Sequence, residues 1–240
     1  MRVDSVDASA YNGTGAYDTV SKDSPIIPSG VFLMALQLHA ITMVDAPASD
    51  ADGPLPSTVR IPFRDLCAVV SEQKAFGLDE ATPELIAAHQ AVVDAVFRRG
   101  PVLPVPVGVV FRAPDVLKRW MELHYVSLTD ALDFVEDRAV ARVHIERGDG
   151  KPGELEAGSD LAAAAAESLR AIRRKAVASV PLRTEAITGV ALSAAFLVER
   201  DAWNEFIVAV DDQRDAHHHL RFETTGPWAP YDFVRMQFGG

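Results

Sequence analysis

The segment RAVARVHIE, residues 138–146, has a regular strand pattern. Its apolar and polar side chains alternate, and only Val140 interrupts the pattern. One face carries Ala139, Ala141, Val143 and Ile145, and the other carries Arg138, Arg142, His144 and Glu146. A period of two is typical of an antiparallel strand with one face on a core and the other in water. We therefore expect a half-exposed antiparallel strand at this position.

The segments that follow alternate between helix and strand patterns. We expect an Ala-rich helix over residues 161–178, a strand over 192–199, a helix after Asp201 and a strand over 220–225. One more strand, over Leu182–Thr188, would complete the order strand, helix, strand, strand, helix, strand, which is that of a ferredoxin-like unit. The sequence thus predicts an α+β fold of two small domains. The C-terminal one, residues 137–240, is ferredoxin-like, with antiparallel strands and packed helices.

The preceding residues, 29–136, predict an N-terminal α+β domain. Strands are expected over residues 31–44, 59–71 and 102–111, and helices over 84–99 and 114–136. Prolines 101, 104 and 106 confine the last strand to a sheet edge or a bulge. The second helix, roughly 35 Å long, would end this domain and connect it to the next. Residues 1–28 are polar and rich in Gly, Ser and Asp, which predicts a disordered N-terminal arm.

The composition argues against several classes of partner. A formal net charge of −11 at pH 7 disfavours nucleic acid and anionic membrane surfaces, since both attract Lys and Arg. The early apolar run, residues 31–44, is interrupted by polar side chains and is shorter than the ~20 residues of a membrane span. Cys67 is the single cysteine, so no disulfide can form within the chain. No secretory signal is recognisable, and we expect a cytoplasmic protein.

No pattern of catalytic or cofactor-binding residues is present. The sequence has no GxSxG elbow, no P-loop, no GxGxxG after a strand and no HExxH. His217, His218 and His219 could chelate a surface ion weakly, but a solvated run of histidines is the favoured interpretation. His89 lies on the apolar side of its helix and is expected to be a packed histidine rather than a ligand. We expect no catalytic, cofactor or metal site.

Two proline-rich motifs stand out: GPVLP at residues 100–104, which leads to Phe111, and GPWAPYDFV at residues 226–234. Proline fixes φ and removes a donor, so the second motif is expected outside helix and sheet interiors. Each single side chain is best explained by packing, but an edge strand beside a rigid aromatic tail is also a natural docking surface. The candidate partner-binding or motif residues are Gly100, Pro101, Leu103, Pro104, Phe111, Gly226, Pro227, Trp228, Pro230, Tyr231 and Phe233.

The order and spacing of these motifs resemble the gas vesicle protein F/L family. In that family a helix with a histidine, here His89, leads into GPVLP, and a GPWPPYSFV segment follows an AYLV strand much later. Residues 195–198, AFLV, resemble that strand, and the likeness covers about residues 31–234. Val107 stands where the family has Phe, and Ala229 and Asp232 stand where it has Pro and Ser.

The resemblance implies an accessory protein of gas vesicle formation rather than an enzyme. Its expected partners are the hydrophobic shell-forming protein and other gas vesicle accessory proteins, with no cofactor. An alternative within the same interpretation is that the protein is itself a minor component of the vesicle wall. The residues alone also leave open a ferredoxin-like small-molecule-binding regulatory module, or an enzyme without a recognisable motif. A compact pocket of converging polar groups would favour these alternatives, and a broad apolar groove would favour the assembly protein. The oligomeric state is left open.

Overall fold

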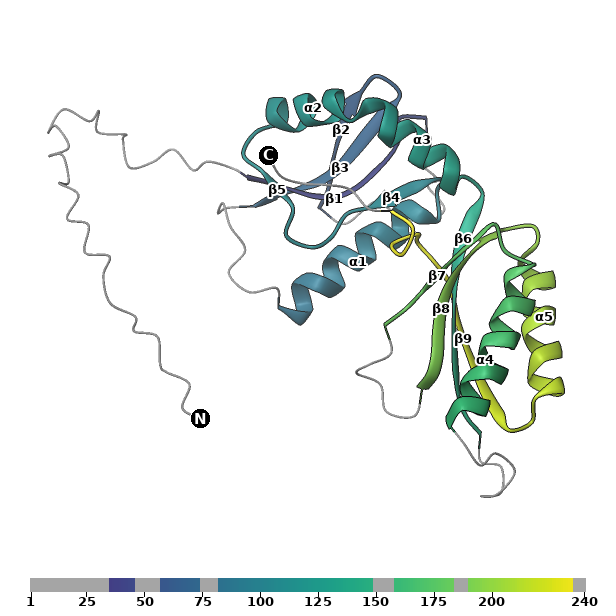
Figure 1. Cartoon of the computed structure of the whole chain (residues 1–240). Helices are drawn as coiled ribbons and strands as arrows, with labels where there is room; N and C mark the ends of the chain where they lie inside the picture. The colour runs from purple at the N-terminus through teal and green to yellow at the C-terminus, as the bar shows by residue number, and fades with distance from the viewer. Residues whose placement is uncertain (1–34, 46–56, 74–81, 149–157, 184–189, 235–240) are drawn as a thin grey trace, which may run out of the picture. The chain divides into compact units, whose positions relative to one another are not determined.

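A computed structural model describes residues 35–45, 57–73, 82–148, 158–183 and 190–234, which form two antiparallel sheets and five helices (Figure 1). All of them belong to one unit, residues 32–240. The arm expected over residues 1–28 lies outside the described residues. The α+β fold class is confirmed, whereas the division into two domains at residue 136 stays a prediction.

The first sheet has the strand order β2-β3-β1-β4, and β5 also pairs with β1. Its strands are β1 (Ala35–Met43), β2 (Val59–Phe63), β3 (Leu66–Gln73), β4 (Val102–Pro104) and β5 (Val110–Phe111). All pairs are antiparallel. β1 is central and buried along nearly its whole length, as its apolar sequence predicted.

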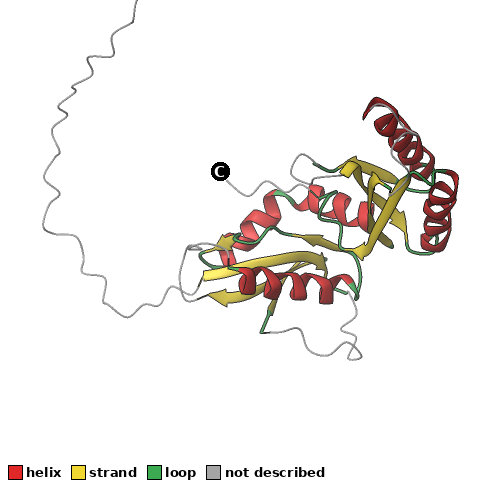
Figure 2. Ribbon diagram, turned by 90° about the horizontal axis from the view of Figure 1, so that it is seen from below, coloured by secondary structure: helices red, strands yellow, loops and turns green. Residues whose placement is uncertain are grey.

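Helices cover both faces of this sheet. α1 (Pro83–Phe97) packs on one face through Val92, Val93 and Val96. The other face is covered by α2 (Pro114–Leu123) and α3 (Tyr125–Val135). Figure 2, coloured by secondary structure, shows the helices packed against the strands. None of the helices in the described part of the chain combines the length and the apolar character that crossing a membrane requires.

The single helix expected over residues 114–136 is wrong, because the chain bends at His124. His124 has φ −105° and ψ 9°, which ends α2 and begins α3. The bend has a packing reason, since α2 contacts β2 and β5 whereas α3 contacts β1 and β4. Two shorter helices can follow the twisted surface of one sheet where a straight rod would leave it.

The second sheet has the strand order β7-β8-β6-β9, with antiparallel pairs throughout. Its strands are β6 (Arg138–Arg147), β7 (Ala178–Pro181), β8 (Val190–Glu199) and β9 (Leu220–Trp228). α4 (Gly158–Arg173) follows β6 and α5 (Trp203–Ala216) follows β8. Ala141, Val143 and Ile145 of β6 face the helices and form a core with Ile172 and Phe206. This succession and strand order are those of the predicted ferredoxin-like unit.

Three strand predictions need correction. The extra strand expected over Leu182–Thr188 lies earlier, at β7, because α4 ends at Arg173; residues 184–189 lie outside the described part. The strand material over residues 59–71 is a hairpin, in which Arg64 has a φ of 54°. The strand over residues 102–111 is two short strands, β4 and β5, at the edge of the sheet where its prolines predicted it.

The strand expected over residues 220–225 extends into the second proline motif, because residues 226–228 continue β9, which lies at the edge of the sheet. The pairing with β6 shifts register between Val140 and Arg142, after which Val140 lies opposite Trp228. Gly226 has a φ of 130°, and the Gly226–Pro227 peptide is cis. The strand tolerates this proline because β9 lies at the edge of the sheet and the proline follows an irregularity.

Candidate functional site

The two proline motifs, more than a hundred residues apart in the sequence, meet beside helix α1. Gly100, Pro101 and Pro230 line a hollow of about 230 Å³ at the end of α1. Val107, Trp228 and Tyr231 line a larger hollow, of about 440 Å³, along its side. We call the larger one the α1–tail hollow. Its other lining residues are His89, Gln90, Asp94, Arg142 and Ala229.

Most of the first motif is used for packing. Leu103 and Pro104 are buried in β4, and Leu103 belongs to the core under α2 and α3. The Thr42 hydroxyl donates a hydrogen bond of 2.7 Å to the Pro101 carbonyl. Phe111 packs on Trp120, with 5.8 Å between ring centroids. These residues therefore hold the sheet edge in place, and only the segment around Val107 reaches the α1–tail hollow.

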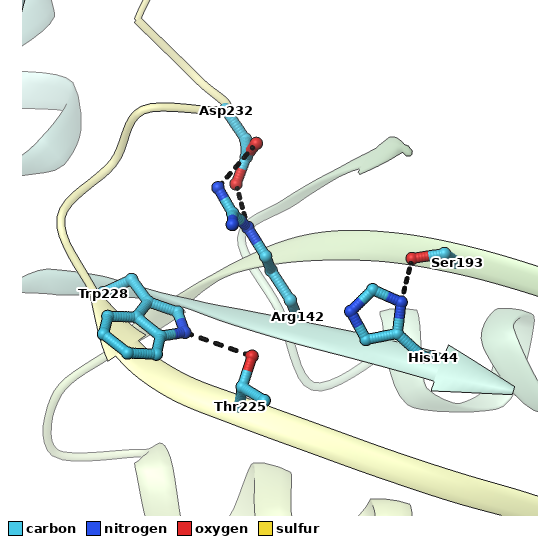
Figure 3. A network of polar contacts seen from close by, with 6 residues as sticks. All are labelled: Arg142, His144, Ser193, Thr225, Trp228 and Asp232. Carbon is cyan, nitrogen blue, oxygen red and sulfur yellow. Dashed lines mark hydrogen bonds and ion pairs between the residues drawn. The ribbon is translucent and has the colours of Figure 1, made fainter. Parts of the chain in front are cut away.

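The second motif divides into an exposed and a packed part. Gly226, Pro227 and Trp228 are exposed, and Trp228 keeps 44% of its surface in water. Its indole Nε1–H donates to Thr225 Oγ1 at 3.1 Å, which orients the ring (Figure 3). Ala229 and Pro230 are buried. Tyr231, Phe233 and Val234 pack against three different apolar clusters of the protein.

An ion pair that the sequence analysis missed ties this tail to β6. Arg142 Nε and Nη2 donate to the two carboxylate oxygens of Asp232 at 2.9 and 3.2 Å (Figure 3). The alternation of residues 138–146 placed Arg142 on the polar face, but its partner is 90 residues further along the chain. Only the three-dimensional fold brings them together, so one sequence carries no signal for the pair.

Tyr231 has an unusual position in the α1–tail hollow. Its hydroxyl oxygen is buried and has no hydrogen-bond partner among the described residues. Burial and the nearby Asp94 carboxylate raise the pKa of Tyr231 well above its usual value, so the phenol is neutral. Asp94 is half-buried and forms no ion pair of 4 Å or less with a described residue. Gln90 and Asp94 lie four residues apart on α1 and so share one side of the helix, which the sequence analysis did not single out.

Below the hollow, histidine side chains form a buried chain of hydrogen bonds. His89 Nε2 lies 2.8 Å from the Val105 carbonyl, to which it donates. His89 Nδ1 then accepts from His39 Nδ1 at 2.9 Å, and His39 Nε2 accepts from the Ser71 hydroxyl at 2.9 Å. Burial lowers the pKa of both imidazoles, that of His39 to about 4. His89 is thus a packed, hydrogen-bonded histidine, as its helical position predicted.

The three consecutive histidines lie between α5 and β9. His217 ends α5, and His218 and His219 lie in the turn before β9. The rings of His217 and His219 pack edge to face, with 5.7 Å between centroids. Among the described residues, no group of three or more His, Cys, Asp or Glu side chains is placed to hold a metal ion.

A family comparison agrees with the motifs. The model of the family described as gas vesicle synthesis protein GvpL/GvpF matches residues 38–152 and 154–235, which is most of the chain. The chain belongs to this family. Membership in the GvpL/GvpF family implies a role in gas vesicle formation, and the resemblance noted in the sequence is thereby confirmed.

Individual GvpL/GvpF relatives are distant in sequence. Gas vesicle protein F2 of Halobacterium salinarum is 28% identical over 185 residues, 75% of this chain and 81% of the relative. Gas vesicle protein F of a Streptomyces species is 26% identical over 215 residues, 76% of this chain and 90% of the relative. Both alignments span most of each protein, so the likeness is not confined to one motif.

Two crystal structures of GvpF have the same fold. The structure of GvpF from Anabaena superposes with a TM-score of 0.70 at 16% identity, covering 86% of this chain and 98% of the other. That of GvpF from Microcystis aeruginosa gives a TM-score of 0.64 at 14% identity, with coverages of 84% and 99%. At such identities the likeness concerns the fold alone.

Proposed function

We propose that this protein binds the hydrophobic shell-forming subunit of the gas vesicle and assists its incorporation into the growing wall. The observation that carries the proposal is the exposed Trp228 of the second motif, which lines the α1–tail hollow together with Val107, from the segment that follows the first motif. A large aromatic side chain held by a hydrogen bond, yet left in water, is typical of a contact surface.

The physical need for such a protein is simple. A subunit whose surface must face gas exposes apolar area, and in water that area drives aggregation. A partner with a net charge of −11 stays soluble while it covers part of that surface. We place this activity in the cytoplasm before assembly, with the vesicle wall as the other location at which the protein could remain.

The burial of the motif residues narrows the proposed contact surface. Leu103, Pro104 and Pro230 are buried and support the fold. Pro227, Trp228 and Val107 remain accessible and are proposed to contact the subunit. The free edge of β9, which pairs only with β6 among the described strands, lies beside them.

The test compares two truncations of exposed apolar side chains. Trp228→Ala is expected to weaken binding of the purified protein to the shell subunit at least tenfold, since a central aromatic contact is commonly worth 2 kcal/mol or more. Val208→Ala, on α5 and 58% exposed, is the matched control and should bind as the unchanged protein does. Circular dichroism establishes that both variants are folded. Equal affinity for all three proteins would show that Trp228 is not part of the contact surface.

One observation favours a second candidate. Polar residues make up four of the eight that line the hollow, namely His89, Gln90, Asp94 and Arg142. A small-molecule-binding module would use such convergence. A metabolite that raises the melting temperature of the wild-type protein, and not that of Trp228→Ala, would favour this candidate.

A further inference from the structure

The α1–tail hollow contains a carboxylate without a counter-ion. Asp94 lines the hollow and has no ion pair among the described residues. The other charged side chain of the lining, Arg142, already has its partner, because it is held by Asp232 through two hydrogen bonds. Arg142 and Asp232 compensate each other, so the negative charge of Asp94 has no partner in the hollow.

The histidine of the lining does not supply the missing positive charge. His89 is 1% exposed and donates from Nε2 to the Val105 carbonyl. Its Nδ1 accepts from His39, so a second proton on His89 would point at another N–H group. Burial also lowers its pKa. His89 is thus a neutral wall of the hollow at neutral pH.

One further group suits a cation. Trp228 is 44% exposed, and the hydrogen bond that its indole N–H donates to Thr225 restricts rotation of the ring. A guanidinium or ammonium group attracts the face of an indole ring, and Trp is the strongest aromatic partner for a cation.

We propose that the α1–tail hollow binds an arginine or lysine side chain of the protein partner, with Asp94 as its counter-ion and Trp228 as an aromatic wall. The inference deepens the proposed function, on which the identity of the partner rests. A hollow of about 440 Å³ has room for such a side chain. We therefore expect the partner segment that docks here to combine a basic residue with apolar neighbours.

The cation site can be tested without the partner. The probes are Nα-acetylarginine methylamide, the corresponding lysine compound, and the citrulline compound as a neutral analogue of nearly the same shape. Binding is followed by the indole N–H signals of the full protein in NMR spectra. Trp228 is assigned through Trp228→Phe, and Trp120, which packs on the opposite face of the first sheet, is the internal reference. We expect a saturable shift of the Trp228 signal with a cationic probe and none with citrulline.

The carboxylate is tested with two isosteric variants. Asp94→Asn should weaken binding of the cationic probe about fivefold or more, which corresponds to the loss of one partly shielded ion pair. Asp133→Asn, an exposed carboxylate on α3, should leave it unchanged. A Trp228 shift of the same size with citrulline, or undiminished binding to Asp94→Asn, would overturn the inference.

A parallel measurement separates this inference from the proposed function. Binding of the shell subunit is measured to the wild-type protein and to Asp94→Asn. If the wild-type protein binds the subunit but no cationic probe, the proposed function is supported and the cation site is ruled out. If it binds the cationic probes but not the subunit, the cation site is supported and the shell subunit is ruled out as its partner.

Discussion

Arg142 and Asp232 join the inner strand β6 to the C-terminal tail through two hydrogen bonds, of 2.9 and 3.2 Å. The Asp232 side chain is 14% exposed and that of Arg142 is 37% exposed, so solvent screens the pair only in part. The tail between residues 228 and 234 is therefore fixed at both ends, by pairing in β9 and by this ion pair.

Asp232→Asn is expected to lower the free energy of unfolding by about 1 kcal/mol, since a bidentate charged pair becomes a weaker neutral contact. The backbone N–H groups of Phe233 and Val234, which donate to the Pro230 carbonyl, should exchange with deuterium faster. Hydrogen-exchange mass spectrometry checks this. Asp211→Asn, which breaks an exposed pair with Arg214, is the control and should change neither quantity. Unchanged exchange in Asp232→Asn would mean that packing alone holds the tail.

Gly226→Ala should strongly destabilise the protein. A Cβ at this position would lie 2.5 Å from the Val140 carbonyl oxygen and 3.1 Å from Trp203, and the φ of 130° is unfavourable for any other residue. We expect a loss of about 2–3 kcal/mol, measured by urea unfolding. Gly100, whose φ is not positive, is the comparison, and Gly100→Ala should cost clearly less. Similar losses in the two variants would contradict this account of the turn.

Tyr231→Phe is expected to make the protein slightly more stable, by up to about 1 kcal/mol, because it removes a buried hydroxyl that has no hydrogen-bond partner among the described residues. Tyr125→Phe is the matched comparison. The Tyr125 hydroxyl donates to Asp65, so its removal should lower stability. Thermal unfolding of both variants checks the contrast, and a destabilised Tyr231→Phe would show that the hydroxyl is satisfied in solution.

The free energy of unfolding is expected to fall in mild acid because the protein contains buried, neutral histidines. The pKa of His39 is about 4 in the folded protein, below its ordinary value of 6.5, because burial and the neighbouring His89 disfavour the charged form. The unfolded chain therefore binds the proton more tightly. Neutral His39 thus contributes to the free energy of unfolding. This contribution is fully present above pH 6.5 and is lost as the pH falls towards 4, by an amount on the order of 2–3 kcal/mol.

His39→Gln should flatten this pH dependence, because the amide does not titrate. His218→Gln, at an exposed histidine, should retain the slope of the unchanged protein. Urea unfolding at pH 7 and pH 5 gives the comparison. The explanation fails if the free energy of unfolding of His39→Gln falls between these pH values as much as that of the wild-type protein.

The sequence predicted the elements whose signals are local. The alternation of residues 138–146 predicted β6, and the prolines of residues 101–106 predicted an edge position for β4. The bend at His124 was missed because the apolar spacing continues through it, from Met121 to Leu128. The β2–β3 turn was missed because Arg64, rather than Gly or Asn, adopts its positive φ.

The candidate site could be predicted only in part. The motif residues were recognisable in the sequence, but Leu103, Pro104 and Pro230 are buried in the interior of the protein. The hollow owes its chemistry to Asp94 and Arg142, which no motif contains. Their roles depend on contacts between segments far apart in the chain, and such contacts have no signature in a single sequence.

Co-expression with the shell-forming subunit is the decisive experiment for the proposed function. We expect soluble shell subunit to be recovered in complex with this protein when the two are expressed together, and none when the subunit is expressed alone. Recovery should be strongly reduced with Trp228→Ala, although that variant folds. A folded wild-type protein that recovers no shell subunit would show that it does not bind the subunit.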